Sequence, residues 1–96
     1  MARIQITQVH MTAGGTRHEH IASVRWVNID NKTDTGDNTR EQIISWILQV
    51  ANPKNEAWVY GGDTWIEVRV VNANPPYIQT YADGKLTDNL LYLPRY

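Results

Sequence analysis

The three histidines are the residues whose type and spacing come nearest to a metal site. His18 and His20 lie two positions apart at the start of an expected strand, so both side chains would project from one face of a sheet. His10 on the preceding strand could face them, and three imidazoles are enough to hold a zinc ion. That geometry depends on the strand register, and no further carboxylate ligand is indicated, so we expect no metal. A solvated or interfacial histidine pair that responds to pH is the more typical outcome.

The motifs of the common catalytic sites are missing from the sequence. The chain has no cysteine, no Gly-x-Ser-x-Gly elbow, no Walker loop and no dinucleotide-binding fingerprint. Asp83 and Asp88 could form a carboxylate pair, but Asp83 belongs to an expected turn, where aspartate serves the backbone geometry. The sequence therefore predicts a protein that is not an enzyme and that uses no cofactor.

Length and charge restrict the partners of the chain. Its 96 residues suffice for one domain, residues 1–96, and its net charge of −1 offers no general attraction for nucleic acid or an anionic membrane. An anionic ligand would have to be bound by a local group of side chains. The absence of cysteine, of a signal-peptide pattern at the N-terminus and of a long apolar run leads us to expect a cytoplasmic protein, in a bacterial host if it is encoded by a phage.

Alternating apolar residues predict two strands in the first third of the chain. The first covers Arg3 to Met11, and its apolar positions change parity at Val9, as a β-bulge would cause. A Gly14-Gly15 turn leads to the second strand, from His20 to Asn28, so the pair should form a hairpin. The polar segment 28–38, which contains Gly36, is expected to be a loop.

One amphipathic helix is predicted after this loop. Thr39 and Gln42 form the capping-box pattern Thr-x-x-Gln, which marks a helix start, and Asn52-Pro53 should end the helix. The apolar residues of the segment repeat at the spacing of a single helical face. They are Ile43, Ile44, Ile47, Leu48 and Ala51.

Three more strands follow in the second half of the chain. They are expected at Ala57–Tyr60, Thr64–Val71 and Tyr77–Ala82, and Asp83-Gly84 is a hairpin signal between the third of them and the segment from Leu86 onward. The order β-β-α-β-β-β is typical of an α+β fold, with an antiparallel sheet of about five strands and the helix on one face. We expect the helix residues Ile43, Ile44, Ile47 and Leu48 to pack on Val24, Trp26, Ile66, Val68 and Val70.

The opposite face of this sheet is the best candidate for a binding surface. If Val24, Ile66 and Val68 face the helix, then Arg25, Trp65 and Arg69 face away from it. An indole can stack on a planar group while a guanidinium binds phosphate, so the face suits a small anionic, nucleotide-like ligand or a second subunit. Cross-strand pairs of Arg and Glu beside a half-exposed Trp would explain the same residues without any ligand.

Several motifs give the chain a resemblance to a known family. The motifs are HEHI (residues 18–21), TRE (residues 39–41), YIQT (residues 77–80) and TDNLLYLP (residues 87–94), and together they span nearly the whole chain. The chain resembles a family of small bacterial and phage proteins classified only as a domain of unknown function, DUF3892. The resemblance implies a shared fold and no activity. Segment 28–38 departs from the family pattern in its length, and we place no function there.

Two interpretations of the function follow. In the first, the chain is a non-catalytic homo-oligomer that sequesters a nucleotide-derived immune signal, such as a cyclic ADP-ribose-like molecule or a cyclic dinucleotide, by analogy with small phage proteins that do so. Its ligand would contact Arg25, Trp65 and Arg69, with Asp88 and Asn89 at the edge and His18 and His20 as secondary contacts. In the second, the chain is a protein-interaction or structural module, and Asp88 and Asn89 cap backbone groups so that the following leucines can pack.

Overall fold

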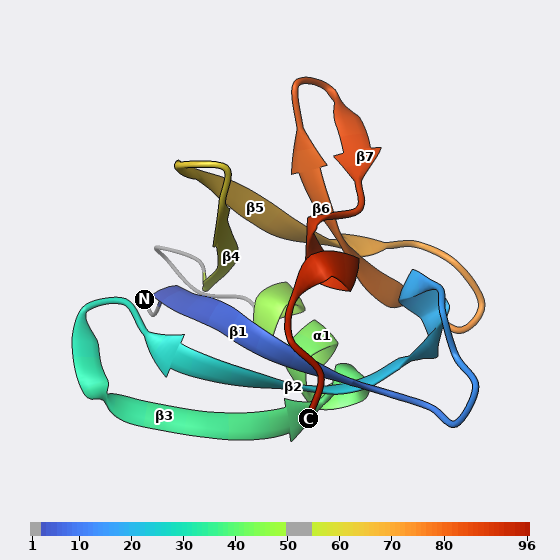
Figure 1. The fold of residues 1–96 in the computed structure, drawn as a ribbon, viewed down its shortest axis with the longest axis horizontal. Helices are drawn as coiled ribbons and strands as arrows, with labels where there is room; N and C mark the ends of the chain where they lie inside the picture. The colour runs from blue at the N-terminus through green and yellow to red at the C-terminus, as the bar shows by residue number, and fades with distance from the viewer. Residues whose placement is uncertain (1–2, 50–54) are drawn as a thin grey trace.

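Strand β1 (Arg3–Met11) lies inside the sheet and has a paired strand on each side. The structure is a computed structural model, and it describes residues 3–49 and 55–96. The sheet has seven strands in the order β3-β2-β1-β4-β5-β6-β7 (Figure 1). The other strands are β2 (Ile21–Asn28), β3 (Asn31–Thr39), β4 (Glu56–Gly61), β5 (Thr64–Val71), β6 (Tyr77–Ala82) and β7 (Lys85–Thr87). The helices are η1 (His18–His20), α1 (Arg40–Leu48) and η2 (Asn89–Tyr92).

The pairing of β1 with its two neighbours confirms one prediction and corrects another. β1 and β2 form the expected antiparallel hairpin, and the register shifts between Ile6 and Gln8, which is the bulge predicted from the change of parity. On its other side β1 pairs with β4 in parallel, so the sheet is not purely antiparallel. Between β1 and β4 the chain passes through β2, β3 and α1. Parallel strands need a long crossover connection of this kind, because a short turn can join only antiparallel strands.

Strand β3 corrects the prediction that segment 28–38 is a loop. It pairs with β2 from Ser23↔Thr39 to Asn28↔Asn31 and forms one edge of the sheet. The residue that suggested a loop, Gly36, lies directly opposite Trp26. A Cβ atom added at Gly36 would lie 2.9 Å from Cζ2 of Trp26, so glycine leaves room here for the indole ring. The glycine therefore belongs to a strand that packs against an aromatic ring.

The last part of the chain carries two of the motifs that resemble the family, YIQT in β6 and TDNLLYLP from the end of β7 through η2. The Asp83-Gly84 hairpin is confirmed: both residues have positive φ angles, 54° and 80°, and β7 pairs antiparallel with β6. Beyond β7 the chain turns into η2, and its last residues return to β1. There Val9 donates a backbone hydrogen bond to Pro94 and accepts one from Tyr96.

Helix α1 packs on one face of the sheet and builds the core. Thr39 and Gln42 form the predicted capping box, and Ile43 and Ile44 are buried. Ile66 and Val68 are buried as well, which confirms the predicted register of β5, and Val24, Trp26, Val70 and Ile47 also belong to or pack on the core. Leu48 is 63% exposed, so its assignment to the core was wrong.

The helix is shorter than the sequence suggested. It ends at Leu48, because Gln49 already has a non-helical backbone conformation. Ala51 and the predicted stop at Asn52-Pro53 lie outside the described residues. In the ranges 3–49 and 55–96 no helix has the length and apolar character needed to cross a membrane.

Candidate ligand-binding cavity

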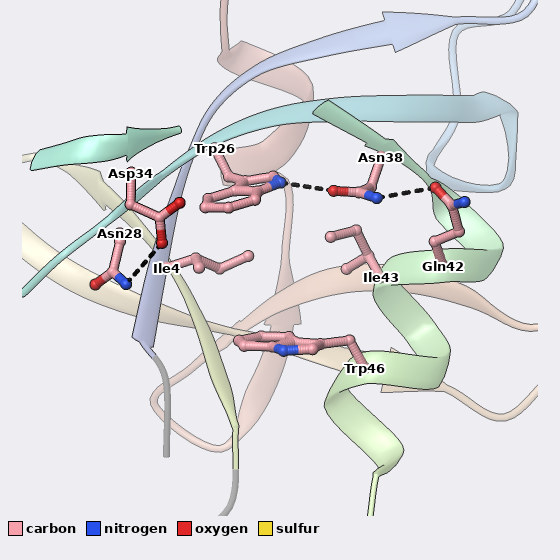
Figure 2. A pocket seen from close by; sticks show the side chains of 8 residues that line it. All are labelled: Ile4, Trp26, Asn28, Asp34, Asn38, Gln42, Ile43 and Trp46. Carbon is pink, nitrogen blue, oxygen red and sulfur yellow. Dashed lines mark hydrogen bonds between the residues drawn. The ribbon is translucent and has the colours of Figure 1, made fainter. Parts of the chain in front are cut away.

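A cavity of about 300 Å³ lies between α1 and the ribbon formed by β2 and β3. Its volume is near the lower end of the range for small-molecule sites in proteins. Figure 2 shows the indoles of Trp26 and Trp46 at two sides of this space, with Ile4 and Ile43 between them. The complete lining is Ile4, Trp26, Asn28, Asp34, Asn38, Gln42, Ile43 and Trp46.

Two short hydrogen-bonded groups form the polar part of the lining. Trp26 Nε1 donates to Asn38 Oδ1 over 2.8 Å, and Asn38 Nδ2 donates to Gln42 Oε1 over 3.0 Å. At the other end of the cavity Asn28 Nδ2 donates to Asp34 Oδ2 over 3.2 Å (Figure 2). These bonds hold the side chains in place before any ligand arrives, and preorganisation of this kind reduces the entropy lost on binding.

The capping box of α1 also positions this polar group. Gln42 Oε1 accepts a bond from the backbone N–H of Thr39, while Thr39 Oγ1 accepts one from the backbone N–H of Gln42. The start of the helix, the end of β3 and the Trp26 indole are therefore joined through Gln42 and Asn38. A cavity with apolar rings and fixed amides can bind a flat molecule by stacking and hydrogen bonding.

The residues predicted from sequence for the polar sheet face do lie away from the core, but Arg25 lies on a strand that is not adjacent to the strand of Trp65 and Arg69. Arg25, Trp65 and Arg69 are exposed on β2 and β5, next to buried Val24, Ile66 and Val68. Strands β1 and β4 separate β2 from β5, which puts the two arginines about 14 Å apart at the usual strand spacing. The two guanidinium groups also contact different rings, Tyr96 for Arg25 and Tyr81 for Arg69.

Each of these exposed side chains has partners of its own. The Arg69 guanidinium lies 3.9 Å from the centre of the Tyr81 ring and forms an ion pair with Glu67 at 2.8 Å. Trp65 packs edge-on against Tyr60, with ring centroids 5.0 Å apart. The Arg69–Tyr81 and Trp65–Tyr60 contacts join neighbouring strands, whereas the Arg69–Glu67 ion pair lies within β5, so the expected pairing of Arg and Glu across strands is not what holds Arg69.

Arg25 has a different environment from Arg69. Its guanidinium lies 4.1 Å from the centre of the Tyr96 ring, donates to Gln8 over 3.3 Å and approaches Asp37 at 4.0 Å. A second cleft of about 290 Å³ lies beside it, lined among others by Thr7 and Thr35. This cleft is the part of the polar face that could receive an anionic group.

His18 and Asp88, both predicted as site residues, are brought together although they are 70 positions apart in the sequence. His18 Nε2 lies 3.9 Å from Asp88 Oδ1. His18 is buried, and among the described residues its Nε2 atom has no hydrogen-bond partner. Burial lowers the pKa of His18, and the nearby Asp88 and Glu19 carboxylates raise it by less. The pair joins η1 to the start of η2.

Asn89, another predicted site residue, belongs to a compact hydrogen-bond network with two threonines. Thr80 is fully buried; its hydroxyl donates to the Thr87 carbonyl over 3.0 Å and accepts from the Asn89 backbone N–H over 3.1 Å. The Thr87 hydroxyl contacts both the Thr80 hydroxyl, at 2.7 Å, and Asn89 Oδ1, at 2.8 Å. The network fixes the turn into η2, where Leu90 is fully buried. The Asn89 side chain thus accepts from a hydroxyl, and Asp88 makes no side-chain cap bond at η2, so the expected capping of backbone groups by these two side chains is not what the structure shows.

The three histidines lie in separate surroundings. His20 Nδ1 accepts hydrogen bonds from the backbone N–H groups of Thr16 and Arg17, so it closes a turn. His10 Nδ1 contacts the backbone oxygen of Tyr96. Within residues 3–49 and 55–96 no group of three or more His, Cys, Asp or Glu side chains could hold a metal ion.

Sequence reasoning missed most of the cavity, for two reasons. Asn28, Asp34 and Asn38 fall in the segment predicted as a loop, to which no function was assigned. Trp46 lies three positions after Ile43, which is the spacing of one helical face, so its position could have been read from the helix pattern. Only a prediction of β3 could have placed the polar residues opposite that face.

Comparison with known proteins identifies a family and nothing more specific. No curated protein and no solved structure matches the chain significantly. A family model described as a protein of unknown function (DUF3892) matches residues 5–94. That match covers almost the entire sheet and all four motifs on which the resemblance was based. The chain therefore belongs to the DUF3892 family.

Proposed function

We propose that this protein binds a small, flat, hydrogen-bonding molecule in the cavity between α1 and the β2–β3 ribbon, and does not transform it. The observation that supports this proposal is the pairing of two indoles, Trp26 and Trp46, with the fixed polar groups of Asn28, Asn38 and Gln42 around one cavity. Indoles offer large apolar contact areas, and the amides give orientation and specificity.

The volume of the cavity restricts the ligand. A space of about 300 Å³ accommodates a nucleobase, a nucleoside-sized heterocycle or a small aromatic amine. A dinucleotide would have to extend past the polar lining, so its base alone would occupy the cavity. The proposed ligand class is therefore heterocycles of about the size of one base.

Calorimetric titration with adenosine, guanosine and nicotinamide tests the proposal. We expect saturable binding that Trp46→Leu weakens at least tenfold, about 1.4 kcal/mol, because the substitution removes one of the ring contacts. Trp65→Leu is the matched control, since it removes an exposed indole on the other face of the sheet. Chromatography of the recovered ligand checks that it is unchanged. Equal affinity in both variants would show that the cavity is not the binding site.

The cleft beside Arg25 favours a second candidate, an anionic nucleotide-derived signal that a phage-type oligomer sequesters. Arg25 lines this cleft together with Thr7, Thr35 and Asp37, and its guanidinium, which approaches Asp37 only at 4.0 Å, offers charge-assisted bonds to a phosphate. In this case cyclic ADP-ribose or a cyclic dinucleotide should bind, and Arg25→Ala should reduce the affinity at least tenfold, about 1.4 kcal/mol. Arg69→Ala serves as the control, because Arg69 lies on β5, which β1 and β4 separate from β2, and forms an ion pair there with Glu67. Binding that is unaffected by Arg25→Ala would remove this candidate.

The exposed aromatic pair Tyr60 and Trp65 favours a third possibility, in which the outer face of β4 and β5 is an interface. Both rings are more than 40% exposed although they pack on each other. Exposed apolar groups of this kind mark interaction sites, and a second copy of the chain is the partner we propose. This interface is compatible with ligand binding, because the cavity lies on the other face of the sheet.

A further inference from the structure

We propose that the cavity selects a cationic ligand: Asp34 provides the counter-charge for a flat, positively charged nitrogen heterocycle that contacts the indoles of Trp26 and Trp46. This inference rests on the proposed function, since it names the charge of the ligand in the same cavity. It differs from the anionic ligand expected from the sequence, which depended on Arg25 and Arg69. Neither of those residues lines this space.

The charge of the lining supports a cation. Of the described residues around the cavity, Asp34 alone has an ionisable side chain. Lys32 is exposed, lies two residues before Asp34 and does not line the space. The Arg40 guanidinium, at the start of α1, is bound to the backbone oxygen of Glu19 and to the Glu41 carboxylate. A bound anion would meet one negative charge and no compensating positive one.

The hydrogen bonds leave the Asp34 carboxylate available to a ligand. Its Oδ2 atom accepts from Asn28, whereas its Oδ1 atom has no hydrogen-bond partner among the described residues. The amide oxygens nearby are already engaged: Asn38 Oδ1 accepts from Trp26, and Gln42 Oε1 accepts from Asn38 and Thr39. Asp34 Oδ1 is therefore the strongest open acceptor at the edge of the cavity.

The two indoles favour positive charge for an independent reason. The face of an aromatic ring is electron-rich, and tryptophan attracts cations more strongly than tyrosine or phenylalanine does. A flat cation can thus contact a ring face and a carboxylate together, while the apolar surfaces of Ile4 and Ile43 exclude water from part of it. A neutral heterocycle of the same shape would keep the stacking and lose both charge interactions.

Three probes of one shape and different charge test the inference. They are nicotinamide, its ring-N-methylated cation and nicotinate, titrated calorimetrically at low salt. We expect the cation to bind about fivefold more tightly than nicotinamide, the ratio for a partly exposed cation–π contact, and nicotinate to bind most weakly. The preference for the cation should decrease as sodium chloride is added, because the carboxylate is exposed to screening.

Two variants with equal changes in net charge locate the effect. Asp34→Asn should reduce the preference for the cation to the part that the indole faces alone provide, and should preserve the affinity for nicotinamide, because asparagine can still accept the bond from Asn28. Asp37→Asn, on the same strand but beside Arg25, should retain the full preference. A preference that is unchanged by Asp34→Asn, or is absent from the unmodified protein, overturns the inference. If nicotinamide still binds in that case, the small-molecule proposal stands; if no probe and no nucleoside binds, both fail.

Discussion

Gly36 leaves the space that the indole of Trp26 fills, and Trp26 in turn lines the cavity. The indole lies over the glycine, and the closest atom to an added Cβ would be Trp26 Cζ2 at 2.9 Å. Gly36→Ala should therefore displace the ring and cost about 1–3 kcal/mol of unfolding free energy, the usual penalty for overpacking. Urea denaturation measures this loss.

A control for this prediction is available on another strand. At Gly61 an added Cβ would lie 3.8 Å from Asn89 Nδ2, which is ordinary van der Waals contact. Gly61→Ala should consequently change the unfolding free energy by much less. Equal effects of the two substitutions would mean that the loss at Gly36 does not come from the contact with the indole.

His18 should make the stability of the protein depend on pH in the acid range. Its pKa in the folded chain is lowered from the ordinary 6.5 by burial, so the unfolded chain takes up a proton more readily. The stability contribution of neutral His18 is fully present above about pH 6.5 and decreases as the pH falls below it. Urea denaturation between pH 7.5 and 5.0 should show this decrease, and His18→Gln should flatten it.

Asp88, the neighbour of His18, allows the pKa of this histidine to be lowered further. The Asp88 carboxylate raises the pKa of His18 and so limits the effect of burial. Asp88→Asn should lower that pKa further and make the loss of stability toward acid pH steeper. An Asp88→Asn profile parallel to that of the unmodified protein would show that the two side chains do not interact in solution.

At the level of elements, the junction between β6 and η2 depends on the buried Thr80 hydroxyl. Thr80→Val would leave the Thr87 hydroxyl and the Asn89 backbone N–H without that partner, at a cost of about 1–3 kcal/mol. Thr80→Ser keeps the hydroxyl and should retain most of the stability. Thr80→Val keeps the size of the side chain and removes the hydroxyl, whereas Thr80→Ser keeps the hydroxyl and removes a methyl group. We therefore expect the lower melting temperature for Thr80→Val, and equal melting temperatures of the two variants would refute the role assigned to the network.

Local patterns predicted those elements that depend on neighbouring residues. The capping box of α1, the bulge in β1, the Asp83-Gly84 turn and the buried face of β5 all follow from residues a few positions apart. Strand β3 could not be found in this way, because asparagine, aspartate and glycine have low strand propensity and only the pairing with β2 makes the segment extended. The parallel β1–β4 pair and the cavity depend on contacts distant in sequence, so they were missed for the same reason.

For the molecule as a whole, self-association through the outer face of β4 and β5 is the property to measure. If Tyr60 and Trp65 lie in an interface between two copies, the unmodified protein should sediment as an oligomer, and Trp65→Ser should shift it to monomer. Leu48→Ser is the control, because Leu48 is a similarly exposed apolar residue on α1. An oligomer that persists in Trp65→Ser would place the interface elsewhere.

Strand β3 lies at one edge of the sheet, and its charged residues therefore affect how the sheet meets other chains. The outer edge of this strand pairs with no described strand, and Lys32, Asp34 and Asp37 are exposed along it. Charged side chains on a terminal strand discourage the addition of strands from other chains, which is the first step of aggregation. The carboxylate proposed to recognise the ligand therefore also contributes to keeping the protein in solution, and a family member that neutralises this position would need another charge on the same edge to remain soluble.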